Sequence, residues 1–219
     1  MATLKAAYCE TDADIYEIGV DEAGRGPMLG RVYAGAVILP KDLTLFNHAL
    51  MKDSKRFHSE KKIKAAAEYI KKNAIAWAVG YADETVIDDI NIRNATHKAM
   101  HEAIKNVLVE DKNVLLLVDG NDFTRYQANE LNTNGNAIPP VCIEGGDNTY
   151  SCIAAASILA KVARDEYIAE LCIANPILIT QYDILKNKGY GTKKHMDGIR
   201  QYGITPFHRK TFGICKQFA

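Results

Sequence analysis

Short apolar runs rich in β-branched residues recur along the chain and predict the strands of a sheet. Five segments have this pattern: 15–20, 32–39, 74–81, 114–118 and 140–143. The turn at 23–30 contains glycine and proline, so the first two runs predict a hairpin of two central strands. The run 114–118 is apolar throughout, which is typical of a strand buried on both faces.

Apolar residues at helical spacing predict helices between and after these strands. Three longer segments have this spacing: 59–72, with Ser59 as its N-cap, 91–109 and 151–174. Residues 176–202 then predict two shorter helices, separated at 188–191 by a segment with two glycines. Strands interleaved with helices, followed by helices alone, predict an α/β sandwich.

The composition is that of an ordinary globular protein. With 219 residues and a mass of 24.2 kDa, the chain 1–219 fits a single domain, in which about 176–219 forms a helical appendage. Hydrophobic residues at 47% and charged residues at 25% exclude the disordered, collagen-like and coiled-coil classes. No apolar run approaches the roughly 20 residues of a membrane span, and the first residues lack a secretory layout. We therefore expect a cytoplasmic protein.

Charge is balanced overall but not along the chain. The 27 basic residues offset 27 acidic ones, whereas 181–219 holds eight Lys and Arg against two Asp. This basic segment fits a surface for a nucleic-acid backbone, although a solvated helical face explains many of its charges equally well. The five cysteines are scattered without CxxC spacing, which favours reduced, mostly buried thiols over a zinc or redox site.

Acidic residues stand where three predicted strands reach glycine-bearing turns: Asp21 and Glu22, Asp119, and Asp147. Hard divalent cations take oxygen ligands, and a pair of them suits phosphodiester hydrolysis, so four converging carboxylates would fit such a site. Consecutive strand residues point to opposite faces, so we expect the first strand to end or bend at Asp21 and Glu22. For each acid alone, a role as turn former or N-cap is an equal alternative.

The run Asp21-Glu22-Ala23-Gly24-Arg25-Gly26-Pro27 resembles the signature of the ribonuclease HII family. Six further segments resemble the family's motifs in the same order: Asp53-Ser54-Lys55; Asn91-Ile92 with Ala95-Thr96 and Ala99-Met100; Asp119-Gly120-Asn121; Gly146-Asp147 with Ile153 to Asp165; Gly189-Tyr190-Gly191-Thr192 with His195; and His208-Arg209 with Phe212. Arg31 and Phe57 depart from the proline and leucine usual there, and neither touches the proposed chemistry. The DEAGRGP run disfavours the sister ribonuclease HIII group.

The resemblance implies a ribonuclease H-like fold, with a central mixed sheet flanked by helices and a C-terminal helical extension. It implies an endonuclease that hydrolyses the RNA strand of RNA–DNA hybrids and cuts 5′ of single ribonucleotides in duplex DNA, with roles in ribonucleotide excision repair and DNA replication. Two Mn²⁺ or Mg²⁺ ions would be held by the catalytic residues Asp21, Glu22, Asp119 and Asp147, and the products would carry 5′-phosphate and 3′-hydroxyl ends.

Seven residues are candidates for substrate binding: Gly24, Arg25, Gly26, Lys55, Ser157, Lys161 and Tyr190. By resemblance, the loop 24–26 and Tyr190 sense the ribonucleotide and the deoxyribose on its 3′ side. The alternatives are a tight turn and a core aromatic. Ser157 and Lys161 lie on one face of the helix 151–174, and Lys161 and Lys55 are candidates for phosphate contact.

Some neighbouring residues favour structural roles. We expect Arg164 and Asp165 to form an internal ion pair, and Asn148 and Thr149 to cap the helix that follows them. His195 and His208 would fit general acids, but structural or surface roles are favoured.

Partners and rival functions follow from the same features. We expect a monomer without an obligatory protein partner, because no clamp-binding motif is evident after Phe212. The rivals are a non-catalytic module that binds hybrids, and a related nuclease acting on branched or damaged DNA. The four acids argue against the first rival, since without cations they would repel phosphate. The loop 24–26 and Tyr190 argue against the second.

Overall fold

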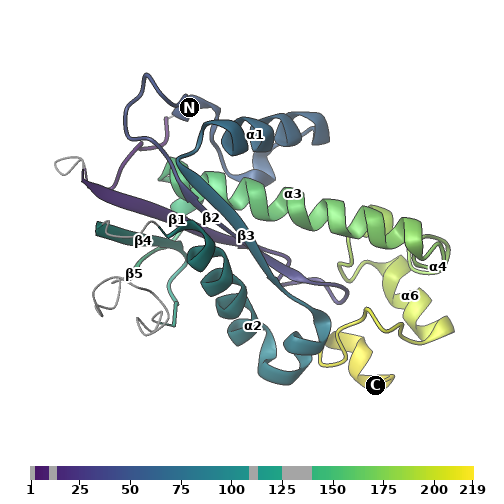
Figure 1. Ribbon diagram of the computed structural model, residues 1–219. Helices are drawn as coiled ribbons and strands as arrows, with labels where there is room; N and C mark the ends of the chain where they lie inside the picture. The colour runs from purple at the N-terminus through teal and green to yellow at the C-terminus, as the bar shows by residue number, and fades with distance from the viewer. Residues whose placement is uncertain (1–2, 10–13, 109–112, 125–139) are drawn as a thin grey trace.

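A computed structural model describes residues 3–9, 14–108, 113–124 and 140–219, and these residues form a five-stranded mixed sheet flanked by helices (Figure 1). The strands are β1 Ile15–Ala23, β2 Val32–Ile38, β3 Ala76–Ala82, β4 Asn113–Asp119 and β5 Pro140–Ile143. Their order is β3-β2-β1-β4-β5. The pairs β1–β2 and β2–β3 are antiparallel, whereas β1–β4 and β4–β5 are parallel. The predicted hairpin and all five predicted strands are confirmed.

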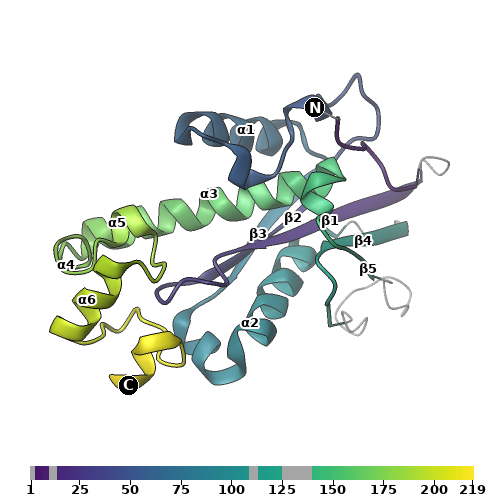
Figure 2. The ribbon, with the colours of Figure 1, turned by 180° about the vertical axis from the view of Figure 1, so that it is seen from behind.

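Helices cover both faces of this sheet. Helices α1 (Glu60–Asn73) and α3 (Ser151–Ala174) lie on one face and α2 (Glu84–Val107) lies on the other, as both views show (Figures 1 and 2). One apolar cluster joins α1 and α3 to the sheet, and a second joins α2 to the opposite face. Short 3-10 helices precede two of these helices: η1 His48–Leu50 and η2 Ser54–Arg56 come before α1, and η4 Gly146–Asn148 comes before α3.

Two glycines set α3 directly on the strand backbones. A Cβ on Gly19 would lie 2.2 Å from the carbonyl carbon of Cys152, and one on Gly35 would lie 2.4 Å from the carbonyl oxygen of Ala156. Real Cβ atoms do not approach backbone so closely, so any larger residue would push α3 away from the sheet. This close packing fixes the height of α3 above the end of β1.

Helix α2 begins earlier than the sequence predicts. It starts at Glu84, where the side chain of Asp83 accepts a hydrogen bond from the backbone N–H of Val86. Asn91 stands inside it with φ 66°, which kinks the helix at the residue where its predicted start lay. The helix ends at Val107, and the predicted end at 109 lies outside the described residues.

The C-terminal extension contains three helices, so the prediction of two is wrong. They are α4 Ile177–Thr180, α5 Ile184–Asn187 and α6 Lys193–Tyr202, followed by the turn η5 Gly213–Gln217. Asp183 and Lys188 both have positive φ, 57° and 54°, and so interrupt the chain on either side of α5. An apolar cluster that includes Leu29, Ile168 and Ile199 packs the extension against the end of α3 and the β1–β2 turn.

The cysteines and the helix lengths fit the expectations from composition. All five cysteines lie among the described residues outside any disulfide, and Cys152, Cys172 and Cys215 are buried. Within the described ranges, none of the helices combines the length and apolar character needed to cross a bilayer.

Candidate active site

Asp21 and Glu22 lie side by side on a strand that does not end there. β1 continues to Ala23, with Asp21 opposite Gly35 and Glu22 opposite Ala34 on β2, so the expected end or bend is wrong. Their side chains therefore lie on opposite faces of the sheet. Asp21 interacts with Ser157 on α3, whereas Glu22 lines a cavity with Thr96 on the α2 side.

Asp119 brings the two faces together at the sheet edge. It is the last residue of β4, which lies parallel to β1 with Val118 opposite Val20. Its Oδ1 accepts a hydrogen bond of 2.7 Å from the backbone N–H of Gly146, and the N–H of Asp147 lies 3.4 Å from the same oxygen. The carboxyl ends of β1 and β4 and the turn after β5 thus carry their acids to the same edge of the sheet.

Burial and the charges of neighbouring acids raise the pKa values of three of these carboxylates. Burial, followed by the charges of Glu22 and Asp119, raises the pKa of Asp21 well above its usual value. Burial also raises the pKa of Glu22, and burial with the charge of Asp119 raises that of Asp147. For Lys55, burial lowers the pKa, but the nearby carboxylates raise it by more. The group is therefore short of positive charge.

The donor set suits a hard divalent cation, which takes carboxylate oxygens and would offset this repulsion. In the part of the chain that the structure describes, no three His, Cys, Asp or Glu side chains are gathered closely enough to hold an ion as they stand. A cavity of about 190 Å³ opens beside Glu22 and Asp119 and leaves room for ions with their water.

The loop after β1 lies against Tyr190. Gly24 has φ 96°, in the region that favours glycine, and a Cβ on Gly26 would lie 3.4 Å from the ring of Tyr190. Tyr190 is half exposed, and Arg25 extends to 3.4 Å from an oxygen of Glu22. The loop backbone, the ring of Tyr190 and the carboxylate of Glu22 thus share one surface. Tyr190 is therefore not a core aromatic, which was the structural alternative for this residue.

The polar side chains of α3 are already engaged. Ser157 is buried and lies 2.9 Å from the hydroxyl of Ser54, so it would have to leave this pair to contact substrate directly. Lys161 bonds Asp165 at 2.6 Å. The predicted Arg164–Asp165 pair is therefore wrong: Arg164 is buried and donates to the carbonyl oxygens of Lys188 and Leu29.

Asn148 and Thr149 do not cap α3. Its N-cap residue is Tyr150, without a side-chain bond, whereas Asn148 donates to Asp147 and Thr149 donates to the carbonyl of Gly145. These side chains instead brace the turn that carries Asp147. The capping prediction is wrong because the chain makes an η4 turn before the helix starts.

His195 and His208 are buried and lie 3.0 Å apart, which agrees with a structural role. Burial lowers the pKa of His195, and burial with the charge of His195 lowers that of His208 to about 3. Arg209, next in the chain, is also buried, and the sequence offered no signal for that because it stands in a basic segment.

The basic segment pairs part of its charge internally. Lys193 and Arg200 both contact Asp197, and Lys194 contacts Asp183. Lys186 and Lys210 of this segment are exposed.

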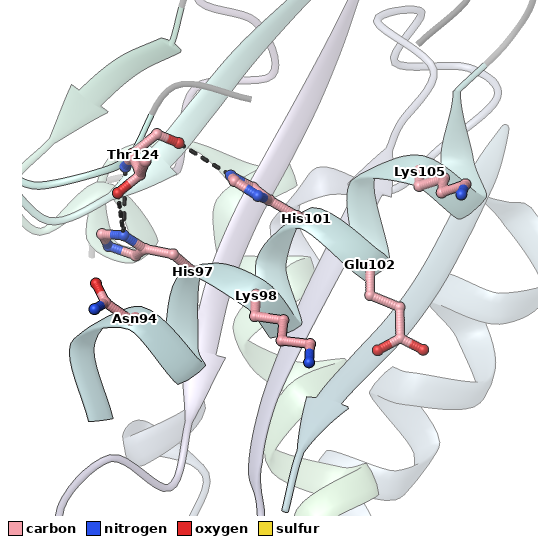
Figure 3. A pocket seen from close by; sticks show the side chains of 7 residues that line it. All are labelled: Asn94, His97, Lys98, His101, Glu102, Lys105 and Thr124. Carbon is pink, nitrogen blue, oxygen red and sulfur yellow. Dashed lines mark hydrogen bonds between the residues drawn. The ribbon is translucent and has the colours of Figure 1, made fainter. Parts of the chain in front are cut away.

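A larger cavity, of about 590 Å³, lies on the outer face of α2 and contains none of the four carboxylates (Figure 3). His97 and His101 point from α2 toward Thr124, with hydrogen bonds of 2.8 and 3.0 Å. These contacts hold the segment after β4 against the helix.

Comparisons with known proteins agree on one family. The family model described as Ribonuclease HII matches residues 18–215. A ribonuclease HII of Bacteroides thetaiotaomicron is 46% identical over 92% of this chain and 91% of its own length, and one of Parabacteroides distasonis is 47% identical over 96% and 95%.

Two crystal structures show the same fold at lower identity. The ribonuclease H2 of Pyrococcus horikoshii superposes with a TM-score of 0.70 at 22% identity, covering 92% of this chain and 96% of that one. Bst-RNase HIII in complex with Mn²⁺ gives a TM-score of 0.65 at 19% identity, covering 94% and 69%. The ribonuclease H-like fold expected from the sequence is confirmed.

Proposed function

The chain belongs to the ribonuclease HII family of metal-dependent endoribonucleases that act on RNA–DNA hybrids, and we propose that it also cuts 5′ of single ribonucleotides in duplex DNA. The observation that carries this proposal is the meeting of Asp21, Glu22, Asp119 and Asp147 at one sheet edge, beside the loop 24–26 and Tyr190. The acids supply the chemistry, and the loop with Tyr190 supplies the choice of nucleotide.

In this mechanism Asp21, Glu22, Asp119 and Asp147 would hold two divalent ions. Ions bound there would supply a metal-activated water and charge stabilisation for the departing 3′ oxygen, so the products would carry 5′-phosphate and 3′-hydroxyl ends. Asp21 reaches the site from the α3 face and Glu22 from the α2 face, while Asp119 is held by its bond from Gly146. Either Mn²⁺ or Mg²⁺ fits an all-carboxylate set, and Mn²⁺ is the ion bound in the related Bst-RNase HIII structure.

Substrate recognition requires contact with the 2′-hydroxyl, the group that distinguishes RNA from DNA. Gly24 and Gly26 would let the loop backbone approach a ribose, and Tyr190, next to Gly26, would contact the adjoining deoxyribose. Lys55, beside the carboxylates, and Lys161 would contact phosphates, the latter by exchanging Asp165 for the nucleic acid. Extended backbone contact by the residues 176–219 would make affinity fall with salt.

The chain would perform this function as one domain, 1–219, and as a monomer; the cytoplasmic location expected from the sequence stays a prediction. Both rival functions, the binding module and the nuclease of branched or damaged DNA, predict different products from the same substrates.

Cleavage of labelled duplexes tests the proposal. The substrates are a DNA duplex with one ribonucleotide, an all-DNA duplex, a branched DNA and an RNA–DNA hybrid, each with Mg²⁺, Mn²⁺ or chelator. Metal-dependent cutting immediately 5′ of the ribonucleotide, reduced about 100-fold or more by Asp119→Asn, would support the proposal. Tight hybrid binding without cutting would favour the binding module, and cutting of all-DNA or branched duplex would favour the other nuclease.

A further inference from the structure

Three segments far apart in sequence meet behind the surface formed by the loop 24–26 and Tyr190. The backbone N–H of Met28 donates to the carbonyl of Gly189, that of Gly30 donates to Phe207, and that of Arg209 donates to Met28. Leu29 and His208 form an isolated antiparallel bridge between the same segments. The C-terminal extension is therefore joined directly to the β1–β2 turn.

Arg209 binds the back of the loop. Its side chain is fully buried, and it donates to the carbonyl oxygens of Gly24 at 2.7 Å, Arg25 at 2.9 Å and Gly30 at 2.8 Å. Among the described residues, no carboxylate forms a salt bridge with it. Burying a guanidinium without an acid is costly, and here its donors serve backbone carbonyls of the loop.

His208, the preceding residue, holds Tyr190 through His195. The backbone N–H of Thr205 donates to Nδ1 of His208 at 2.9 Å, so this nitrogen is the acceptor and Nε2 carries the proton. His208 Nε2–H then donates to Nε2 of His195 at 3.0 Å, which leaves the proton of His195 on Nδ1. That Nδ1–H donates to the carbonyl oxygen of Tyr190 at 2.9 Å.

The backbone donor thus gives the histidine chain one direction from Thr205 to Tyr190. Both histidines are buried, and a second proton on either ring would place two donors against each other. On His195 it would be added at Nε2, 3.0 Å from Nε2–H of His208, and on His208 at Nδ1, 2.9 Å from the N–H of Thr205. The neutral chain is the arrangement that satisfies all its members.

We propose that His208 and Arg209 form a brace that holds the loop 24–26 and Tyr190 in register, and that His195, His208 and Arg209 are positioning residues for recognition of the ribonucleotide–deoxyribonucleotide junction. The inference rests on the proposed function. Its physical basis is that His208 and Arg209 are adjacent in the chain. Arg209 holds the loop 24–26, and His208 holds Tyr190 through His195, so the distance between Gly26 and Tyr190 depends on the fixed spacing of these two residues. A displacement of about 1 Å at such a site costs up to about 100-fold in rate.

Hydrogen exchange tests the brace without any activity. The variants are His195→Asn, which shortens the chain to Tyr190, and Arg209→Lys, which keeps the charge but loses the fork. His48→Asn is the matched control, because His48 is also a buried histidine with two hydrogen bonds, to Ser151 and Pro40. Amides in 24–30 and 189–192 should exchange at least about tenfold faster in both test variants and not in the control. Unchanged exchange in these segments would overturn the brace.

Cleavage kinetics then test recognition. The quantity compared between variants is kcat/KM on a single-ribonucleotide duplex divided by kcat/KM on a long RNA–DNA hybrid. Both values come from one preparation, so their ratio is independent of the fraction of protein that is folded. The hybrid has no deoxyribose on the 3′ side, so it does not use the contact with Tyr190. We expect the ratio to fall about tenfold in His195→Asn, which loosens Tyr190, and to stay unchanged in His48→Asn. Arg209→Lys loosens the loop that both substrates use, so it should lower both kcat/KM values about tenfold.

A double-mutant cycle separates positioning from a general loss of fold. In a Tyr190→Ala background, His195→Asn should lower the ratio no further, since the ring that it positions is absent. Additive effects in this cycle, faster exchange with an unchanged ratio in His195→Asn, or unchanged kcat/KM values in Arg209→Lys would overturn the role in recognition. If a variant fails to fold, Thr205→Val is used in its place. This change removes only the hydroxyl that lies 2.8 Å from His208 Nδ1, so a smaller fall of the ratio is expected. If the wild type cuts neither substrate, the proposed function fails, and exchange still decides whether the brace exists.

Discussion

Gly24 and Gly120 allow the steric part of a glycine substitution to be separated from its backbone part. Both residues have φ 96°. A Cβ on Gly24 would lie 2.3 Å from Nε and 2.4 Å from Cδ of Arg164, whereas nothing lies within 4 Å of a Cβ on Gly120. Each Gly→Ala change therefore costs about 1–3 kcal/mol for the unfavourable φ, and only Gly24→Ala adds a clash.

The clash is costly because Arg164 cannot move aside. It is 1% exposed, its Nη2 donates to Lys188, and its buried Nε has no hydrogen-bond partner. Overpacking of a core typically costs about 1–3 kcal/mol, and each kcal/mol shifts Tm by about 2–4 °C in a chain of this size. We expect Gly24→Ala to melt about 2–12 °C below Gly120→Ala.

Differential scanning calorimetry in the presence of chelator measures this difference without metal stabilisation of the site. Urea unfolding at 25 °C provides an independent value for both variants. Equal melting temperatures, or a lower one for Gly120→Ala, would refute the claim that Arg164 is packed rigidly under the loop.

Three further predictions concern charge. Asp21→Asn should raise Tm in chelator at pH 7.5, because burial and the charges of Glu22 and Asp119 raise the pKa of Asp21 and make its ionised form costly. Added Mn²⁺ should stabilise the wild type more than the variant. A lower Tm of the variant in chelator would contradict this prediction. His208 has a folded pKa of about 3, below the roughly 6.5 of an unfolded chain, so its stabilising effect is complete above about pH 6.5 and is lost as pH falls. Urea unfolding should therefore show the wild type losing about 2 kcal/mol more than His208→Gln between pH 6.5 and 5, and parallel pH profiles would count against a buried neutral His208. Hybrid affinity in Ca²⁺, measured by fluorescence anisotropy, should fall linearly in log–log form with salt, and Lys210→Gln should reduce the slope by about 1; an unchanged slope would remove Lys210 from the binding surface.

The strands and the long helix α3 could be predicted because their patterns are local. β-branched apolar runs and the glycine-bearing turns after them are visible in the sequence, and α3 has the predicted bounds, 151–174. Asp119 could also be placed at a strand end from the sequence, because β4 ends where its apolar run meets this residue, whereas β1 continues past Asp21 and Glu22 to Ala23.

Tertiary contacts decided the rest. Asn91, Asp183 and Lys188 have positive φ although they are not glycine, and the local sequence pattern does not single out these positions. Asp165 pairs with Lys161 one turn away, because Arg164 points into the core toward Leu29 and Lys188. Residue spacing along the helix could not reveal these partners of Arg164.

Metal binding tests the central claim most directly. Mn²⁺ would be titrated into the wild type and Asp119→Asn, with electron paramagnetic resonance counting free ions, in the presence of a hybrid whose scissile linkage cannot be cleaved. If the carboxylates of β1, β4 and the β5 turn form the site, the wild type should bind two ions and the variant should lose at least one of them. Equal binding by both proteins would contradict the assignment of Asp119, and with it the proposed convergence of the four acids on the metal ions.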